Sequence, residues 1–322
     1  MKLIAELCQN HNGDENAMLK MVDEAAEAGA THVKVQHILA ENVTFRPQFE
    51  AGGIDRVSGV EFIKRPYDAE YARMKGLELD DSSVKKFIAR CIENNVIPLT
   101  TCFCTQHAGH LSSLGFKEIK VASYDCASHH MLKILKHQFD HIYVSTGATF
   151  NNEIASAAAI LPKEKSSFLH CVTRYPTPLT ALNLGRIDWL RKFNRPVGYS
   201  DHSLKSRDGL GAVKLALYFG AELIEVHYRI FAEDESKDGP VSVDKEQLRE
   251  LSDFDNLSLE AKKVEIKNLG LLEFSDVSTH AFEMSEEEYK NRLYFRGRFA
   301  SLVDSDGIRR HVYNWENMDG YY

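Results

Sequence analysis

The stretch VGYSDHSLKSRDGLGAVKLALYFGAELIEVH, residues 197–227, contains two short apolar runs separated by a helix-like segment. Val197 to Ser200 and Leu223 to His227 have the pattern of buried β-strands, and Asp208 to Phe219 has helical spacing. Two histidines, His202 and His227, stand at the ends of these runs. This order predicts a βαβ unit with parallel strands, whose carboxyl ends bring both imidazoles to one edge of a sheet.

The same alternation recurs along the whole chain. Leu3 to Glu6 begins the first unit, Asp14 is placed to cap the helix that follows, and Gly29 is placed to stop it before a second strand begins. The remaining predicted strands are His32 to Gln36, Val96 to Thr101, Glu118 to Val121, His141 to Ser145 and Ser167 to Cys171. Eight repeats predict a closed (β/α)8 TIM barrel rather than an open doubly wound sheet. No glycine-rich phosphate fingerprint follows any strand, which weakens a nucleotide-binding alternative.

The helix from Ser83 to Asn94 shows the clearest apolar stripe, made by Val84, Phe87, Ile88, Cys91 and Ile92. The barrel is expected to occupy residues 1–253 and a short C-terminal appendage residues 254–322. Within the appendage, alternation from Arg298 to Val303 before a Ser305-Asp306-Gly307 turn predicts a small hairpin.

An insertion of roughly 45 residues, Ala40 to Asp81, is too long for a simple connector and is typical of a loop that covers a binding site. It carries the cations Arg46, Arg56, Lys64, Arg65 and Arg73. They form either a basic lid over an anionic substrate or a solvated charged loop.

The formal net charge of −8 argues against a nucleic-acid or anionic-membrane partner and favours a small-molecule substrate. With no signal peptide and no spanning apolar run, we expect a cytoplasmic protein. The six cysteines show no paired spacing typical of zinc or disulfide frameworks, so we expect reduced core residues.

Several strand ends carry residues suited to chemistry. His202 and His227 could hold a divalent transition metal, or could be hydrogen-bonded barrel histidines. Lys34 and Lys120, near the ends of buried strands, each need an anionic partner, which a phosphorylated or carboxylated substrate would supply without a protein ion pair. The alternatives are an internal bridge to Glu6 or Asp125, or a Schiff-base lysine.

Two further groups of side chains are expected at the same mouth. The serines Ser123, Ser145 and Ser200 lie close to loop amides that could add to an anion site. The carboxylates of Glu6, Asp125 and Asp238 could act as a general base or orient a sugar hydroxyl, and structural pairing is the alternative.

Taken together, these segments resemble the sialic acid synthases and their relatives, which condense phosphoenolpyruvate with an N-acetylated aldose. The resemblance covers roughly the first 250 residues. The matching segments are Ile4-Ala5-Glu6 with Asn10-His11-Asn12-Gly13, Val33-Lys34-Val35-Gln36, Lys120-Val121-Ala122-Ser123, Ser145-Thr146-Gly147, His170-Cys171 with Tyr175-Pro176-Thr177-Pro178, Ser200-Asp201-His202, and Glu225-Val226-His227.

The resemblance implies a role for each matched position. His202 and His227 would bind a divalent cation, Mn²⁺ or Mg²⁺, and Glu6 and Asp238 would lie near the reacting centre. The residues matching phosphoenolpyruvate positions are Lys34, Lys120, Ser123, Ser145 and Ser200, and those matching the sugar site are Gln36, Asp125, Thr173 and Tyr175. Arg174, where relatives vary, could meet an acidic or differently substituted sugar.

The implied reaction gives a nonulosonic acid and inorganic phosphate. A synthase acting on a phosphorylated aldose and a catalytically silent sugar-binding barrel are the alternatives. The family also implies a homodimer, because many members end in an antifreeze-like domain that reaches across a dimer with an arginine. Residues 258–322 do not clearly match that domain; Arg296, Arg298, Arg309 and Arg310 are the possible substitutes for its arginine.

Overall fold

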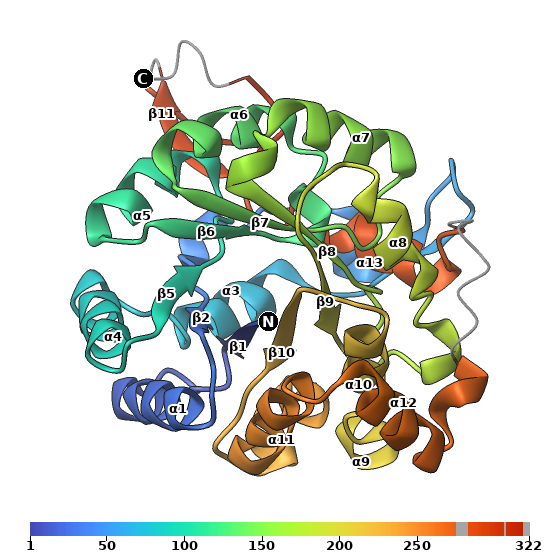
Figure 1. Cartoon of the computed structure of the whole chain (residues 1–322). Helices are drawn as coiled ribbons and strands as arrows, with labels where there is room; N and C mark the ends of the chain where they lie inside the picture. Colours follow the sequence, from blue (N-terminus) through green and yellow to red (C-terminus); the bar gives the residue numbers. More distant parts are fainter. Residues whose placement is uncertain (275–282, 306, 318–322) are drawn as a thin grey trace.

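The computed structural model describes residues 1–274, 283–305 and 307–317, and its centre is a closed parallel barrel. The strands follow the order β5-β2-β1-β10-β9-β8-β7-β6, and a parallel bridge between Thr101 and Lys120 joins β5 to β6. Figure 1 shows them around a common axis with helices outside. The predicted TIM barrel is therefore confirmed. Its strands are β1 (Lys2–Cys8), β2 (His32–Val35), β5 (Ile97–Thr100), β6 (Glu118–Val121), β7 (His141–Ser145), β8 (Ser166–His170), β9 (Val197–Asp201) and β10 (Leu223–His227).

Helices follow the strands and cover the outside of the barrel. Asp14 caps the first of them as predicted, since its carboxylate accepts hydrogen bonds from the backbone N–H groups of Asn16 and Ala17. The covering helices are α1 (Glu15–Glu27), α4 (Asp81–Glu93), α5 (Ala108–Leu114), α6 (His129–Gln138), α7 (Asn151–Ile160), α8 (Gly185–Arg191), α9 (Lys205–Asp208), α10 (Gly211–Tyr218) and α11 (Lys245–Asp255).

Two helix predictions were partly wrong. In α4 the stripe of Val84, Phe87, Ile88 and Cys91 is buried, but Ile92 is 64% exposed because it lies at the edge of the stripe in the last turn. The single helix expected from Asp208 to Phe219 is interrupted at Gly209, whose φ of +53° is not helical, so α9 and α10 are separate.

The barrel interior is apolar at one end and polar at the other. Ile4, Leu99, Tyr143, Leu169 and Leu223 form a buried cluster inside it. Side chains two residues apart on a strand share a face, so the residues two positions further on also point inward. Those residues are Glu6, Thr101, Ser145, Cys171 and Glu225, and all line the main cavity. The apolar cluster therefore closes the amino end of the barrel and leaves a pocket at the carboxyl end.

The insertion and the appendage pack together over this pocket. Val43 in the insertion bridges to Phe299 in the appendage, and the Thr44 hydroxyl donates to the Gly297 carbonyl at 2.6 Å. The insertion contains η1 (Ala40–Asn42), α2 (Gln48–Ala51), β3 (Gly53–Ile54), β4 (Glu61–Phe62) and α3 (Tyr67–Lys75). The appendage contains α12 (Leu259–Asn268), α13 (Glu286–Phe295), β11 (Ser301–Ser305) and β12 (Ile308–Val312).

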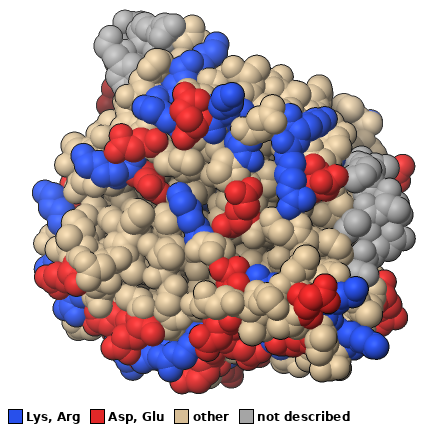
Figure 2. Space-filling view, viewed as in Figure 1, with Lys and Arg blue, Asp and Glu red and all other residues tan. Residues whose placement is uncertain are grey.

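The antiparallel pair of β11 and β12 confirms the predicted hairpin, although residue 306 of its predicted turn lies outside the described residues. Helix α11 runs through residue 253, where the sequence placed the end of the barrel domain; that division stays a prediction. Among the described residues, no helix is both long and apolar enough to cross a membrane. Acidic and basic side chains are interspersed on the face drawn in Figure 2.

Candidate active site

A cavity of about 570 Å³ opens at the carboxyl ends of the barrel strands. Its volume falls within the range typical of small-molecule sites. All thirteen predicted site residues line it: Glu6, Lys34, Gln36, Lys120, Ser123, Asp125, Ser145, Thr173, Tyr175, Ser200, His202, His227 and Asp238. The fold therefore brings together residues that are more than 230 positions apart in the chain, while their individual roles stay predictions.

The floor of the cavity is a buried network of two lysines and two carboxylates. Lys34 forms ion pairs with Glu6 and, at 3.2 Å, with Glu225, while Lys120 lies 3.5 Å from Glu225 and donates to the Ser145 hydroxyl. The expectation that these lysines lack protein ion partners was wrong, and the alternative of an internal bridge to Glu6 is confirmed for Lys34. Glu225 was missed, although its position two residues before His227 on the same strand face was a usable signal.

Burial and pairing act on this network in opposite directions. Burial would raise the pKa of Glu225, but the ammonium groups of Lys120 and Lys34 hold it below its ordinary value. Burial also lowers the pKa of Lys120, whereas for Lys34 the effect of burial is outweighed by Glu225 and Glu6, and its pKa is raised. Two cations and two carboxylates thus balance at the floor.

The serines of the predicted anion site lie close to this floor. Ser123 contacts the Cys171 thiol at 3.0 Å, and Ser145 accepts from Lys120. Ser200 is buried beside Glu225, its register partner across β9 and β10.

The two predicted metal-binding histidines face the cavity from neighbouring strands. Their ring centroids lie 5.7 Å apart, and burial, followed by the charge of His227, lowers the pKa of His202 to about 4. The Nδ1 of His202 lies 2.9 Å from the Val172 carbonyl, which assigns the proton to Nδ1, and Nε2 accepts from the Tyr175 hydroxyl at 2.8 Å. His202 is thus a neutral imidazole whose Nε2 lone pair is occupied by the hydrogen bond from the Tyr175 hydroxyl at the pocket wall.

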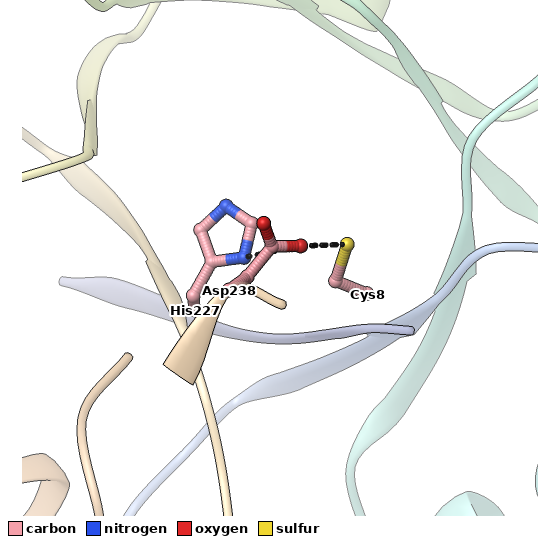
Figure 3. A group of neighbouring side chains, drawn as sticks. All are labelled: Cys8, His227 and Asp238. Carbon is pink, nitrogen blue, oxygen red and sulfur yellow. Dashed lines mark hydrogen bonds and ion pairs between the residues drawn. The ribbon is translucent and has the colours of Figure 1, made fainter. Parts of the chain in front are cut away.

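His227, Asp238 and Cys8 form a compact group in which one potential ligand atom from each lies within 4.8 Å of the others (Figure 3). His227 Nδ1 is buried without a hydrogen bond and lies 4.0 Å from Asp238 Oδ2. An orphaned imidazole nitrogen beside a carboxylate fits a divalent cation such as Mn²⁺ or Mg²⁺. Cys8 was not among the predicted site residues, although it ends β1 two residues after Glu6.

The chemistry of Cys8 differs from that of its two neighbours. Burial, followed by the charges of Asp238 and Glu6, raises the pKa of the Cys8 thiol well above its ordinary value. The protonated thiol donates to Asp238 Oδ2 at 2.8 Å, so Cys8 orients this carboxylate (Figure 3). The loop that supplies Asp238 turns at Gly239, where a Cβ atom would lie 2.0 Å from the Glu233 carbonyl.

The sugar-site candidates receive support from the appendage. Asp125 accepts hydrogen bonds from Ser128 and from the Asn314 side chain, so the alternative in which a lysine bridges to Asp125 is not the arrangement found. Burial raises the pKa of Asp125 to about 6. Asn291 donates to the Thr173 carbonyl at 2.6 Å, and the Thr173 hydroxyl is buried without a partner.

The cations of the insertion divide into three groups. Arg65 and Arg73 line the cavity, as a basic lid requires, whereas Arg56 and Lys64 are exposed and do not. Arg46 donates to the backbone carbonyls of residues 293, 294 and 296 and so fastens the insertion to the appendage.

Among the appendage arginines, Arg298 alone of the four candidates lines the described cavity. Arg296 pairs with Glu153, and Arg309 pairs with Glu41. Arg174, named as a residue that could meet an acidic or differently substituted sugar, does not line the cavity and pairs with Glu287 at 2.7 Å.

A closed (β/α)8 barrel with a polar pocket at the carboxyl ends of its strands has the architecture of barrel enzymes. The chain belongs to the NeuB family, whose model matches residues 21–263, and it is a protein of the sialic acid synthase family.

Similar proteins support this assignment. The chain is 28% identical to the N,N'-diacetyllegionaminic acid synthase of Campylobacter jejuni, over 95% of this chain and 91% of the relative. It is 25% identical to a pseudaminic acid synthase of Campylobacter jejuni, over 98% and 85% of the two chains. The crystal structure of N-acetylneuraminic acid synthetase from Leptospira borgpetersenii is 27% identical with a TM-score of 0.66, covering 91% of this chain and 90% of that one. These relatives are nonulosonic acid synthases, which supports a condensing synthase here.

Proposed function

We propose that the protein condenses phosphoenolpyruvate with an N-acetylated aldose, similar to N-acetylmannosamine, to give a nonulosonic acid and inorganic phosphate. The observation that carries the proposal is the convergence of all thirteen candidate residues on one cavity. A donor site, a cation site and an acceptor site next to one another are what such a condensation requires.

Lys34 and Lys120, with Ser123, Ser145 and Ser200, would hold the phosphate and carboxylate of the donor. Their ammonium groups already lie at fixed positions against Glu225, so binding requires little rearrangement of the side chains. Gln36, Asp125, Thr173 and Tyr175 would bind the sugar.

His202 and His227 would hold a divalent cation, with Asp238 beside His227. When bound, such a cation would polarise the open-chain aldehyde of the sugar. The C3 carbon of phosphoenolpyruvate then forms the new bond to the aldehyde carbon. Water adds to the cationic C2, and cleavage of the bond between C2 and the phosphate oxygen releases inorganic phosphate.

Two carboxylates compete for the role of general base toward this water. Glu6 accepts from the Cys8 amide through one oxygen and pairs with Lys34 through the other. Asp238 is 22% exposed to the cavity side, and its contacts with Cys8 and His227 use Oδ2. We therefore assign the proton transfer to Asp238. Glu6 is assigned the role of positioning Lys34.

A silent sugar-binding barrel is the weaker alternative, because the candidate donor-site lysines and the candidate cation site are both present. The test is mass spectrometry of the products after incubation with phosphoenolpyruvate, Mn²⁺ and a panel of N-acetylated hexoses. One new mass, with equimolar phosphate release, is expected. Lys120→Met should raise the KM for phosphoenolpyruvate. Absence of donor consumption with every acceptor would contradict the proposed function.

A further inference from the structure

Tyr175 occupies the one atom of His202 at which a cation could bind. The Nδ1–H of His202 donates to the Val172 carbonyl at 2.9 Å, which leaves Nε2 with the only lone pair of the ring. The Tyr175 hydroxyl donates to this Nε2 at 2.8 Å. A metal ion and a hydroxyl hydrogen need the same lone pair, so they exclude each other. Coordination by His202 therefore requires the Tyr175 hydroxyl to leave.

The phenol ring adds to this contact. The ring centroids of Tyr175 and His202 lie 4.0 Å apart, with 31° between the ring planes. The His227 ring lies edge-on to Tyr175, at 6.3 Å and 87°. Tyr175 thus lies against both candidate cation ligands, and its hydroxyl is the part that competes for a lone pair.

The backbone that carries Tyr175 is fixed on both sides. On the carboxyl side, the Thr177 N–H donates to the His202 carbonyl at 2.8 Å. On the amino side, the Asn291 side chain in α13 donates to the Thr173 carbonyl at 2.6 Å. Because both flanks are held, the hydroxyl leaves His202 by rotation of the Tyr175 side chain and not by movement of the loop.

The cavity gives this side chain room to rotate. Tyr175 lines the cavity and is 45% exposed, whereas His202 is only 5% exposed. The same cavity is lined by Gln36, Asp125 and Thr173, the other candidate sugar residues. Rotation away from the histidines therefore carries the hydroxyl into the space that the acceptor would occupy.

We infer that the Tyr175 hydroxyl has two alternative partners, His202 and the acceptor sugar, and that this choice couples the cation site to the acceptor site. On Nε2 of His202 the hydroxyl competes with a divalent cation. Once it has turned into the cavity, it can bind the acceptor. Cation and acceptor then bind cooperatively, because both favour the same position of Tyr175. The coupling rests on the proposed function, whereas the competition at His202 does not depend on the identity of the acceptor.

The first test measures the affinity for Mn²⁺ directly, by following the electron paramagnetic resonance signal of the free ion during a titration. Tyr175→Phe keeps the ring against His202 and removes the competing hydroxyl. We expect it to lower the Kd for Mn²⁺ about three- to tenfold, because one hydrogen bond no longer has to be broken. An unchanged or raised Kd would overturn the inference.

Tyr124→Phe is the matched control for this titration. Tyr124 also lines the cavity and its ring stacks on Phe295 at 5.0 Å, but within the described part of the chain its hydroxyl has no hydrogen bond to either histidine. This variant should bind Mn²⁺ as the wild type does, and thermal unfolding shows that both variants are folded. An equal fall in the Kd of both variants would indicate a general change of the cavity and would overturn competition at His202.

The second test asks for opposite effects on the two ligands. At saturating Mn²⁺, Tyr175→Phe should raise the KM for N-acetylmannosamine about three- to tenfold, although it binds Mn²⁺ more tightly. A side chain that only supported the structure would weaken both. In the wild type, N-acetylmannosamine should also lower the Kd for Mn²⁺, and Tyr175→Phe should lose this effect. An unchanged KM for the acceptor would overturn the coupling.

The two tests separate the inference from the proposed function. If no acceptor turns over, the proposed function fails, but tighter Mn²⁺ binding by Tyr175→Phe still supports the competition at His202. If neither the wild type nor Tyr175→Phe binds Mn²⁺, the cation site fails and the inference fails with it. Equal Mn²⁺ affinity of the two proteins together with normal turnover would overturn the inference alone.

Discussion

Replacing Glu225 by Gln tests the charge balance on which the cavity floor depends. The side chain is 7% exposed and lies 3.2 Å from the Lys34 ammonium and 3.5 Å from that of Lys120. Glutamine keeps the shape of the carboxylate and removes its charge. Lys34 would retain Glu6, but Lys120 would keep only neutral acceptors, the Ser145 hydroxyl and the Val121 carbonyl.

The expected loss is large because an ammonium is left buried and uncompensated. Breaking a buried ion pair by removing one partner typically costs about 3–5 kcal/mol. For a chain of 322 residues, whose unfolding entropy scales with length, a loss of about 3 kcal/mol lowers Tm by about 4 °C. Phosphoenolpyruvate would return negative charge to this floor, so it should raise the Tm of the variant more than that of the wild type.

The dependence on pH gives a second signature of the same interaction. The lysines hold the folded-state pKa of Glu225 below its ordinary value of 4.5, so the stabilisation is fully present above that pH. It is lost as the pH falls toward the lowered folded-state pKa. The Tm difference between wild type and Glu225→Gln should therefore be largest near neutral pH and shrink in acid.

Thermal unfolding followed by circular dichroism, with and without phosphoenolpyruvate, measures these effects. Glu93→Gln is the control, since Glu93 is 68% exposed, lies 3.4 Å from Arg90, and belongs to a class of pair worth little. If Glu225→Gln were as stable as the wild type at pH 7, the carboxylate would not compensate the lysines and the description of the floor would be wrong.

Three further predictions concern the cation site, a buried acid and the barrel packing. His202→Ala should abolish turnover and lower the metal content of the purified protein measured by mass spectrometry; full activity in metal-stripped buffer would refute the cation role. Burial raises the pKa of Asp125 from 3.8 to about 6, so this carboxyl binds a proton more tightly in the folded state than in the unfolded state. The stability that Asp125 contributes therefore falls as the pH rises from about 4 to 6. Asp125→Asn should therefore gain up to about 3 kcal/mol relative to wild type between pH 4 and pH 7 in denaturant titrations, and a constant difference would contradict the buried-acid assignment. Gly198→Ala should destabilise the barrel by about 1–3 kcal/mol or more, because the new Cβ would meet Leu223 at 2.3 Å. Gly109→Ala should not, because its Cβ would lie 3.8 Å from the Gln138 side chain, an ordinary contact distance. Equal Tm values for the two variants would argue against close packing of β9 on β10.

Much of the fold could be read from local pattern. Every predicted strand is present, shifted at its ends by no more than two residues, because a buried parallel strand imposes apolar residues over four to five positions whatever its neighbours are. The N-cap at Asp14 was also predicted from local sequence. Predictions failed where the local pattern was ambiguous, as for Ile92 at the edge of a stripe and Gly209 within a helical segment.

The candidate site could be gathered from sequence for a geometric reason. In a closed parallel barrel the carboxyl ends of all strands surround one opening, so Glu6, Lys34, Lys120 and His227 had to meet once their strands were assigned. Strand order therefore indicated that these four share the cavity, whereas Gln36, Thr173 and Tyr175 were implied by the resemblance to the sialic acid synthases.

Which of those residues pair with one another was decided only by the tertiary structure. Glu225 balances two lysines from other strands, Cys8 orients Asp238 across 230 positions, and Glu70 meets Arg298 from the appendage. Such partners are far apart in the chain and leave no periodic signal, because an ion pair constrains two side-chain ends and not the spacing of residues between them. The sequence by itself determined the barrel and most of the residues at its mouth, and the tertiary packing determined which charged side chains meet there.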